Sequence, residues 1–102
     1  MSRASLEEVR TAFERYLEAE RNLSVHTIRA YLGDLDSFFN HLERLDLNDL
    51  SALELSHIRS WLANQQVKGG ARTTLSRRAT SIRLFTKWAT KKGYLVKDVG
   101  AT

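Results

Sequence analysis

The apolar residues between positions 28 and 42 recur every three or four places, which is the spacing of one face of an α-helix. They are Ile28, Tyr31, Leu32, Leu35, Phe38, Phe39 and Leu42. A stripe this wide must be buried against other elements, and the chain has no proline that would interrupt it. The pattern predicts a helix over 24–43, about 30 Å long, with Ser24 as its N-cap.

The same spacing predicts three more helices, and turn residues separate them. Ser5 is a good N-cap for the first helix because Glu8 follows at the spacing of a capping box. Gly69 and Gly70 break the chain between the last two helices, and Gly93 suits the position just after a helix end. The leucine-rich segment before residue 55 is expected to be an ordered connection packed on the core. The sequence thus predicts an all-α, four-helix bundle, with helices over 5–20, 24–43, 55–67 and 72–92.

Charge is divided unequally between the two halves of the chain. Residues 1–54 carry 6 Lys or Arg and 11 Asp or Glu, whereas residues 55–97 carry 10 Lys or Arg and no Asp or Glu. Such segregation produces a positive face, and nucleic acid is the commonest polyanion inside a cell. The other interpretation is a solvated, lysine-rich surface with no partner.

Composition excludes several classes of function. No apolar run approaches the roughly 20 residues of a membrane span, and the N-terminus lacks the apolar block of a secretory signal. With 102 residues and no cysteine, we expect a single soluble domain in the cytoplasm. The sequence has no histidine cluster with metal-binding spacing and no phosphate-binding glycine loop, so no catalytic residue, metal or cofactor is predicted.

The predicted helix 72–92 carries its cations together. On a helical wheel of this helix with Leu75 at zero, the apolar residues, which include Phe85 and Ala89, fall between about 280° and 40°. Cations and hydroxyls occupy the arc from about 60° to 200°, which we call the basic face. Arg78 falls on the apolar side, where we expect it to pair with an acidic residue of the N-terminal half. The basic face consists of Arg72, Thr73, Ser76, Arg77, Thr80, Arg83, Lys87 and Lys91.

The chemistry of the basic face favours duplex DNA. Arginine and lysine neutralise phosphates, serine and threonine donate hydrogen bonds to them, and arginine can fork onto a guanine edge in the major groove. An RNA duplex has a major groove too narrow for a helix. Trp88, at the border of the apolar arc, is expected to pack in the core and not to stack on bases.

The start of the helix over 24–43 forms a second candidate anion site. Unpaired backbone N–H groups and the helix dipole lie there beside Ser24, His26, Thr27 and Arg29. His26 is either a phosphate contact or an exposed residue without a role. Gly33 on the same helix either lets a phosphate backbone approach or contacts another helix.

Several short motifs together resemble a known family. The segments ERNLSVHTIRAYLGDLDSFFNHL and ARTTLSRRATSIRLFTKWATKKG are similar to the N-terminal core-binding domain of Xer-type tyrosine recombinases, which are phage integrase relatives. The resemblance extends over nearly the whole chain. It implies a SAM-like fold that forms half of a C-shaped clamp on duplex DNA, with the second and fourth helices in the major groove. It also implies a role in DNA recombination. Resolution of chromosome dimers is the expected process, and phage or plasmid integration is the alternative that the sequence leaves open.

The resemblance implies partners, and the sequence also departs from the family pattern at one capping position. A catalytic domain of the same chain and further recombinase protomers are the expected partners, besides double-stranded DNA. The catalytic Arg, His and nucleophilic Tyr of that domain have no counterpart here, so the chain is expected not to cut DNA. Ala71 stands where relatives often have a capping Ser, which weakens one expected phosphate contact. Residues 93–102 are expected to begin the linker to a catalytic domain that this chain lacks.

A function of another class also fits the charge pattern. The chain could be a helical protein-interaction domain whose basic face docks an acidic partner. The acidic first half would even allow head-to-tail association of two copies. Titration with a DNA duplex distinguishes the two functions.

Overall fold

Four α-helices and one short 3₁₀ helix make up the regular structure of residues 5–101, the part of the chain that the computed structural model describes. The fold is therefore all-helical, as predicted, and each α-helix begins and ends within one residue of its expected position. The elements are α1 (Leu6–Ala19), α2 (Val25–Arg44), η1 (Leu50–Ala52), α3 (Leu55–Val67) and α4 (Arg72–Lys91).

The helix ends follow from local capping chemistry. The hydroxyls of Ser5 and Ser24 accept hydrogen bonds from the backbone N–H groups of residues 8 and 27, which satisfies donors that no helical turn can reach. At the start of α3, the N–H of Glu54 donates to Nδ1 of His57 at 2.9 Å. α4 begins at Arg72, and no described side chain caps it, because its N-cap residue is Ala71. It ends before Gly93, whose φ of 86° is the left-handed conformation expected after a helix terminus.

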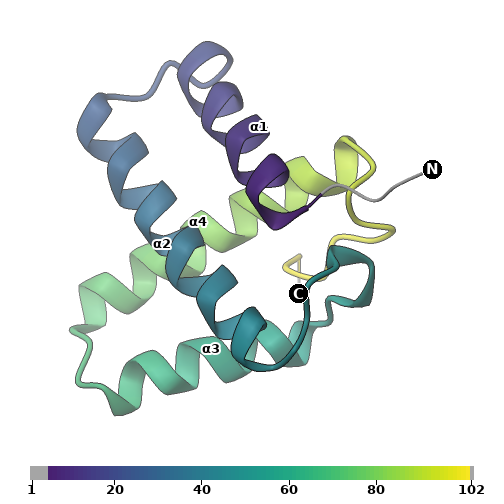
Figure 1. Ribbon diagram of the computed structural model, residues 1–102. Coiled ribbons are helices and arrows are strands. Elements are labelled where there is room, and N and C mark those ends of the chain that lie inside the picture. Colours follow the sequence, from purple (N-terminus) through teal and green to yellow (C-terminus); the bar gives the residue numbers. More distant parts are fainter. Residues whose placement is uncertain (1–4, 102) are drawn as a thin grey trace.

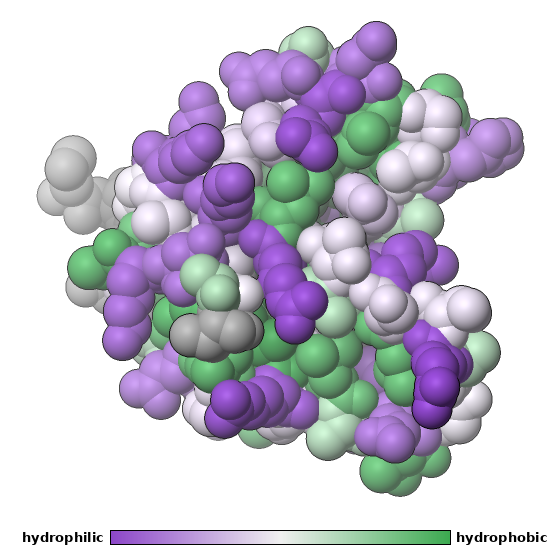
Figure 2. All heavy atoms as spheres, turned by 180° about the vertical axis from the view of Figure 1, so that it is seen from behind, coloured by the Kyte–Doolittle hydropathy of each residue, from purple (hydrophilic) through white to green (hydrophobic). Residues whose placement is uncertain are grey.

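The helices form two hairpins that cross each other (Figure 1). α1 and α2 run in opposite directions, as do α3 and α4, and α2 lies across the middle of α4. The N-terminal ends of α2 and α4 thus come to the same side of the molecule. Figure 2 views the molecule from behind and shows hydrophilic side chains interspersed with pale and hydrophobic ones.

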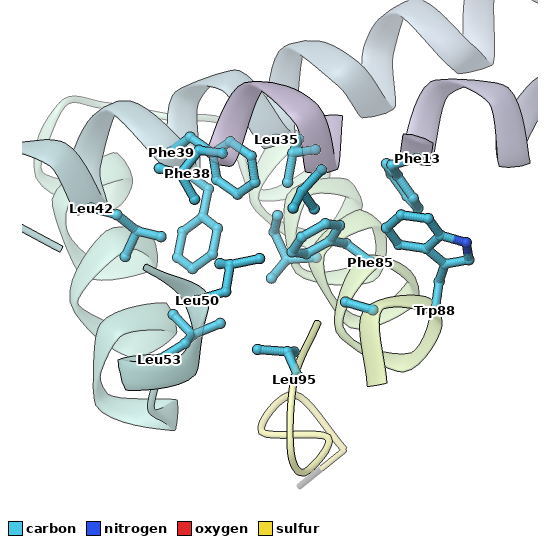
Figure 3. Close-up of a cluster of buried hydrophobic side chains, with 14 of the residues drawn as sticks. Phe13, Leu35, Phe38, Phe39, Leu42, Leu50, Leu53, Phe85, Trp88 and Leu95 are labelled. Atoms are coloured by element: carbon cyan, nitrogen blue, oxygen red, sulfur yellow. The ribbon is translucent and has the colours of Figure 1, made fainter. Parts of the chain in front are cut away.

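The core lies where the two hairpins meet, and aromatic rings fill much of it (Figure 3). Phe85 of α4 makes edge-on contacts with Phe13 of α1 and Phe39 of α2, with ring centroids 5.3 and 5.6 Å apart. Trp88 lies 5.2 Å from Phe13 and is 4% exposed, so it packs in the core as expected. Trp61 of α3 closes the other end, and all its surface is buried.

The segment after α4 also belongs to the core. Leu95 and Val99 are buried, and Leu95 points into the cluster of Figure 3 from the returning chain. Gly100 passes so close to α4 that a Cβ atom there would lie 2.4 Å from Oγ1 of Thr86. The described residues of the expected linker therefore turn back along the bundle. That they lead to a further domain stays a prediction.

The connection between α2 and α3 is ordered, as expected from its leucines. Leu47, Leu50 and Leu53 are buried, and Asp49 caps η1 by accepting a hydrogen bond from the N–H of Ser51 at 3.0 Å. Leu45 differs from its neighbours because it is 49% exposed.

Candidate nucleic-acid interface

All eight residues of the basic face are exposed on α4. The opposite side of the helix holds Ile82, Phe85 and Ala89, which are buried. The helix as a whole packs on α2 and α3, and the ring of Phe85 also meets Phe13 of α1. Packing of the apolar side therefore fixes the rotation of α4 and turns the basic face toward solvent.

Three cations in the second half of the basic face have no counter-charge. Arg83, Lys87 and Lys91 stand four residues apart, so they follow one line along α4. None of them forms an ion pair or a side-chain hydrogen bond with another described residue. Like charges at this spacing repel each other by a few tenths of a kcal/mol, and a bound polyanion would remove that cost.

On the side of α4 that carries Ser81, Leu84 and Trp88, the buried surface extends beyond the apolar arc predicted from the helical wheel. Ser81 and Trp88 are buried and Leu84 is half-buried, because α1 and α2 cover this flank of the helix. At the other edge, Leu75 and Ala79 are only half-buried, since the first turns of α4 pack mainly on α3. The basic face is consequently bordered by α2 along the edge that carries Arg77.

Arg77 is the one member of the basic face that is paired with an acidic residue among the described residues. Its Nε and Nη2 atoms donate to the two carboxylate oxygens of Asp34 on α2, at 3.0 and 2.6 Å. These hydrogen bonds are the main cause of the raised pKa of Arg77. The side chain of Asp34 is 1% exposed, whereas that of Arg77 is 42% exposed. Arg77 therefore reaches solvent from a fixed anchor.

Asp34 also gathers two other groups of α4. The Ser81 hydroxyl donates to Oδ2 at 2.9 Å, and Nε of Arg78 lies 3.4 Å from Oδ1. Arg78 donates from Nη1 to the side-chain oxygen of Gln65 on α3. Arg78 thus pairs with an acidic residue of the N-terminal half, as expected, and links three helices. The sequence pattern does not single out Asp34, because its role depends on helices that are distant in the chain.

The predicted residues at the start of α2 are accessible, but part of their hydrogen-bonding capacity is used in the cap. Ser24 donates to Oγ1 of Thr27 at 2.9 Å while it accepts from the Thr27 N–H. His26 and Arg29 are exposed. A similar restriction applies to Thr80 on α4, whose hydroxyl donates to the carbonyl of Ser76 at 3.1 Å.

Gly33 lies open on α2, one residue before Asp34. A Cβ atom at this position would meet nothing within 4 Å, so the contact with another helix that was considered for Gly33 is wrong. Ser37, one turn later, faces α3 and accepts a hydrogen bond from Nε1 of Trp61 at 3.0 Å. Gly33 therefore leaves the surface of α2 open next to Asp34, the partner of Arg77.

A groove of about 490 Å³ between α3 and α4 extends the basic face at its N-terminal end. Leu62, Ala63 and Leu75 line its apolar part, and Arg59, Arg72 and Ser76 add polar groups. Arg59 was not among the predicted site residues. The sequence signal that could have found Arg59 is the acid-free stretch of residues 55–97. A helical wheel of the last helix cannot show Arg59, because this residue belongs to α3.

The histidines serve the fold in the described part of the chain, apart from His26. His41 is buried and shares a hydrogen bond of 2.9 Å with the Ser60 hydroxyl, and burial is the main cause of its lowered pKa. No group of three or more metal-ligating side chains occurs in residues 5–101. The helices described are all too short or too polar to cross a bilayer.

Comparison with known proteins gives one family and a set of close relatives. Residues 11–93 match the family described as phage integrase, N-terminal SAM-like domain. The sequence is 47% identical over 94 residues to tyrosine recombinase XerC of Mycobacterium sp. (strain JLS), which covers 91% of this chain and 31% of the relative. It is 48% identical over 89 residues to tyrosine recombinase XerC of Mycobacterium bovis (strain BCG / Pasteur 1173P2), covering 87% of this chain and 30% of that protein. The chain thus spans about a third of the length of these relatives. No solved structure matched.

Proposed function

Because the chain belongs to the phage integrase N-terminal SAM-like domain family, we propose that it is the duplex DNA-binding module of a tyrosine site-specific recombinase. The observation that carries this proposal is the line of cations on the solvent side of α4, Arg83, Lys87 and Lys91, which have no ion-pair partner in residues 5–101. Such a line neutralises successive phosphates and gives binding that weakens as salt rises.

The clamp geometry is part of the proposal. α2 and α4 cross with their N-terminal ends on one side, so a duplex could meet the first turn of α2 and the basic face at once. In this arrangement Ser24, Thr27 and Arg29 bind a phosphate while α4 enters the major groove. His26 is the fourth candidate contact of that turn.

The recombination chemistry is assigned to a part of the relatives that this chain does not span. Only the N-terminal domain is matched, and no catalytic step is proposed for its residues. The proposed partners are therefore duplex DNA, the catalytic domain of the same protein and other recombinase protomers. Resolution of chromosome dimers in the cytoplasm is the proposed process, as the resemblance to Xer-type tyrosine recombinases implies.

Chemical-shift mapping with a DNA duplex tests the proposal. The ¹⁵N-labelled protein is titrated with duplex at low salt, and the backbone shifts of each helix are followed. We expect the coherent shifts to fall on the first turn of α2 and on the basic face. Shifts confined to α1, or none at all, would contradict DNA binding at this site. The alternative function, a helical protein-interaction domain with an acidic partner, predicts no coherent shifts on α2 and α4.

A further inference from the structure

The ion pair between Arg77 and Asp34 leaves one edge of the guanidinium free. Asp34 occupies the edge formed by Nε and Nη2. An arginine has five N–H donors, so both N–H groups of Nη1 and one of Nη2 remain. Arg77 makes no other hydrogen bond with a described residue, and 42% of its side chain is exposed. The free edge is a planar pair of donors.

The anchor makes Arg77 different from the other cations of the basic face. Asp34 is buried between α2 and α4 and is held in place by Ser81, so it fixes the plane of the guanidinium. Arg83 and Lys87 have no such partner among residues 5–101, so no carboxylate there fixes their orientation. A cation without a fixed orientation is sufficient for a phosphate, because the contact depends mainly on charge. A fixed two-donor fork matches the O6 and N7 acceptors of guanine, which must be met in one orientation.

The surroundings allow a base edge to come close. Gly33, beside Asp34 in sequence, leaves open space on α2, so no side chain there would hold the duplex away. Asp34 itself is too deeply buried to repel a phosphate by contact. Its charge instead offsets part of the repulsion between Arg77 and Arg78, which are adjacent in sequence and both face it.

We propose that Asp34 is a positioning residue that presents the free edge of Arg77 to a guanine in the major groove, making Arg77 the sequence-reading residue of α4. Arg83, Lys87 and Lys91 then contribute affinity without regard to sequence. This inference rests on the proposed function, because it requires that the chain binds duplex DNA through α4.

Selection from a pool of randomised duplexes at low salt tests the inference. The wild-type protein should enrich guanine at one position at least, by about tenfold over the other bases, as a bidentate arginine contact provides. Arg77→Lys keeps the charge but lacks the fork, and Asp34→Asn keeps the shape but releases the anchor. Both variants should lose the preference at that position, while the salt dependence of Arg77→Lys stays that of the wild type.

Arg78→Lys is the matched control, because Arg78 faces the same carboxylate but points to Gln65 instead of the free surface. It should keep the guanine preference even if it lowers stability. An unchanged preference in Arg77→Lys, an equal loss of affinity for all sequences, or no preference in the wild type would each overturn the inference. Those results would leave duplex binding intact, whereas failure of the wild type to bind any duplex would refute the proposed function itself. Should Asp34→Asn not fold, Arg77→Lys decides alone.

Discussion

Two aspartates on α2 form similar pairs with arginine, but the structure predicts very different energies for them. Asp34 is 1% exposed and accepts hydrogen bonds from Arg77 and Ser81. Asp36, two residues later, pairs with Arg10 of α1 through the same two guanidinium atoms, but 47% of its side chain is exposed. Replacing each by alanine therefore compares a buried pair, together with the Ser81 and Arg78 contacts of Asp34, with an exposed pair.

The expected cost follows from what each replacement leaves behind. Removing one partner of a buried ion pair costs about 3–5 kcal/mol. Arg77 can turn its charge into water, but Arg78 keeps a buried Nε that has no hydrogen bond of its own. We therefore expect Asp34→Ala to lower the free energy of unfolding by about 3 kcal/mol, at the low end of that range. Asp36→Ala should cost at most about 1 kcal/mol, because an exposed pair is well solvated.

Urea unfolding monitored by far-UV circular dichroism measures both effects, with the slope against urea concentration held to the wild-type value. Equal losses in the two variants would refute the reasoning that burial of Asp34 determines the strength of the link between α2 and α4. A loss for Asp34→Ala below about 1 kcal/mol would refute it as well.

Three further predictions concern the core, the returning chain and a histidine. Phe85→Ala should lower the free energy of unfolding by about 3–5 kcal/mol in the same urea assay, because its ring is wholly buried among aromatic residues. Gly100→Ala should destabilise by about 1–3 kcal/mol, since the new methyl group would collide with Thr86, whereas Gly33→Ala meets open space and should stabilise by about 0.5–1 kcal/mol. The lowered pKa of His41 means that the unfolded chain binds a proton first as pH falls below about 6.5. Stability should then decrease with falling pH, by no more than about 1.4 kcal/mol per pH unit until the folded pKa is reached, and His41→Gln should remove this decrease; an unchanged pH profile in that variant would contradict it.

Much of the fold could be predicted because its signals are local. Apolar spacing located the four helices, and Ser5, Ser24 and Gly93 marked helix ends that capping chemistry fixes within one turn. The path of the chain after Gly93 could not be predicted in this way. Leu95 and Val99 are buried in a site that distant elements assemble, and no local pattern in the sequence describes it.

The candidate site was predictable to the same degree. A wheel of one helix was sufficient to place Arg83, Lys87 and Lys91 on the exposed side, since the apolar face alone sets the rotation of α4. It could not show that Arg77 is anchored, because Asp34 lies 43 residues earlier and looks like a polar interruption of the α2 stripe. The packing of α2 on α4 creates this contact.

The salt dependence of duplex affinity tests the central claim most directly. Binding constants of the wild type are compared with those of a variant carrying Arg83→Gln, Lys87→Gln and Lys91→Gln, over a series of salt concentrations. The logarithm of the wild-type constant should fall against the logarithm of salt with a slope of about −3 to −5, and the variant's slope should be smaller by about 2.7, which corresponds to three phosphates. A slope that the three replacements leave unchanged, or an affinity independent of salt, would contradict the assignment of α4 to DNA.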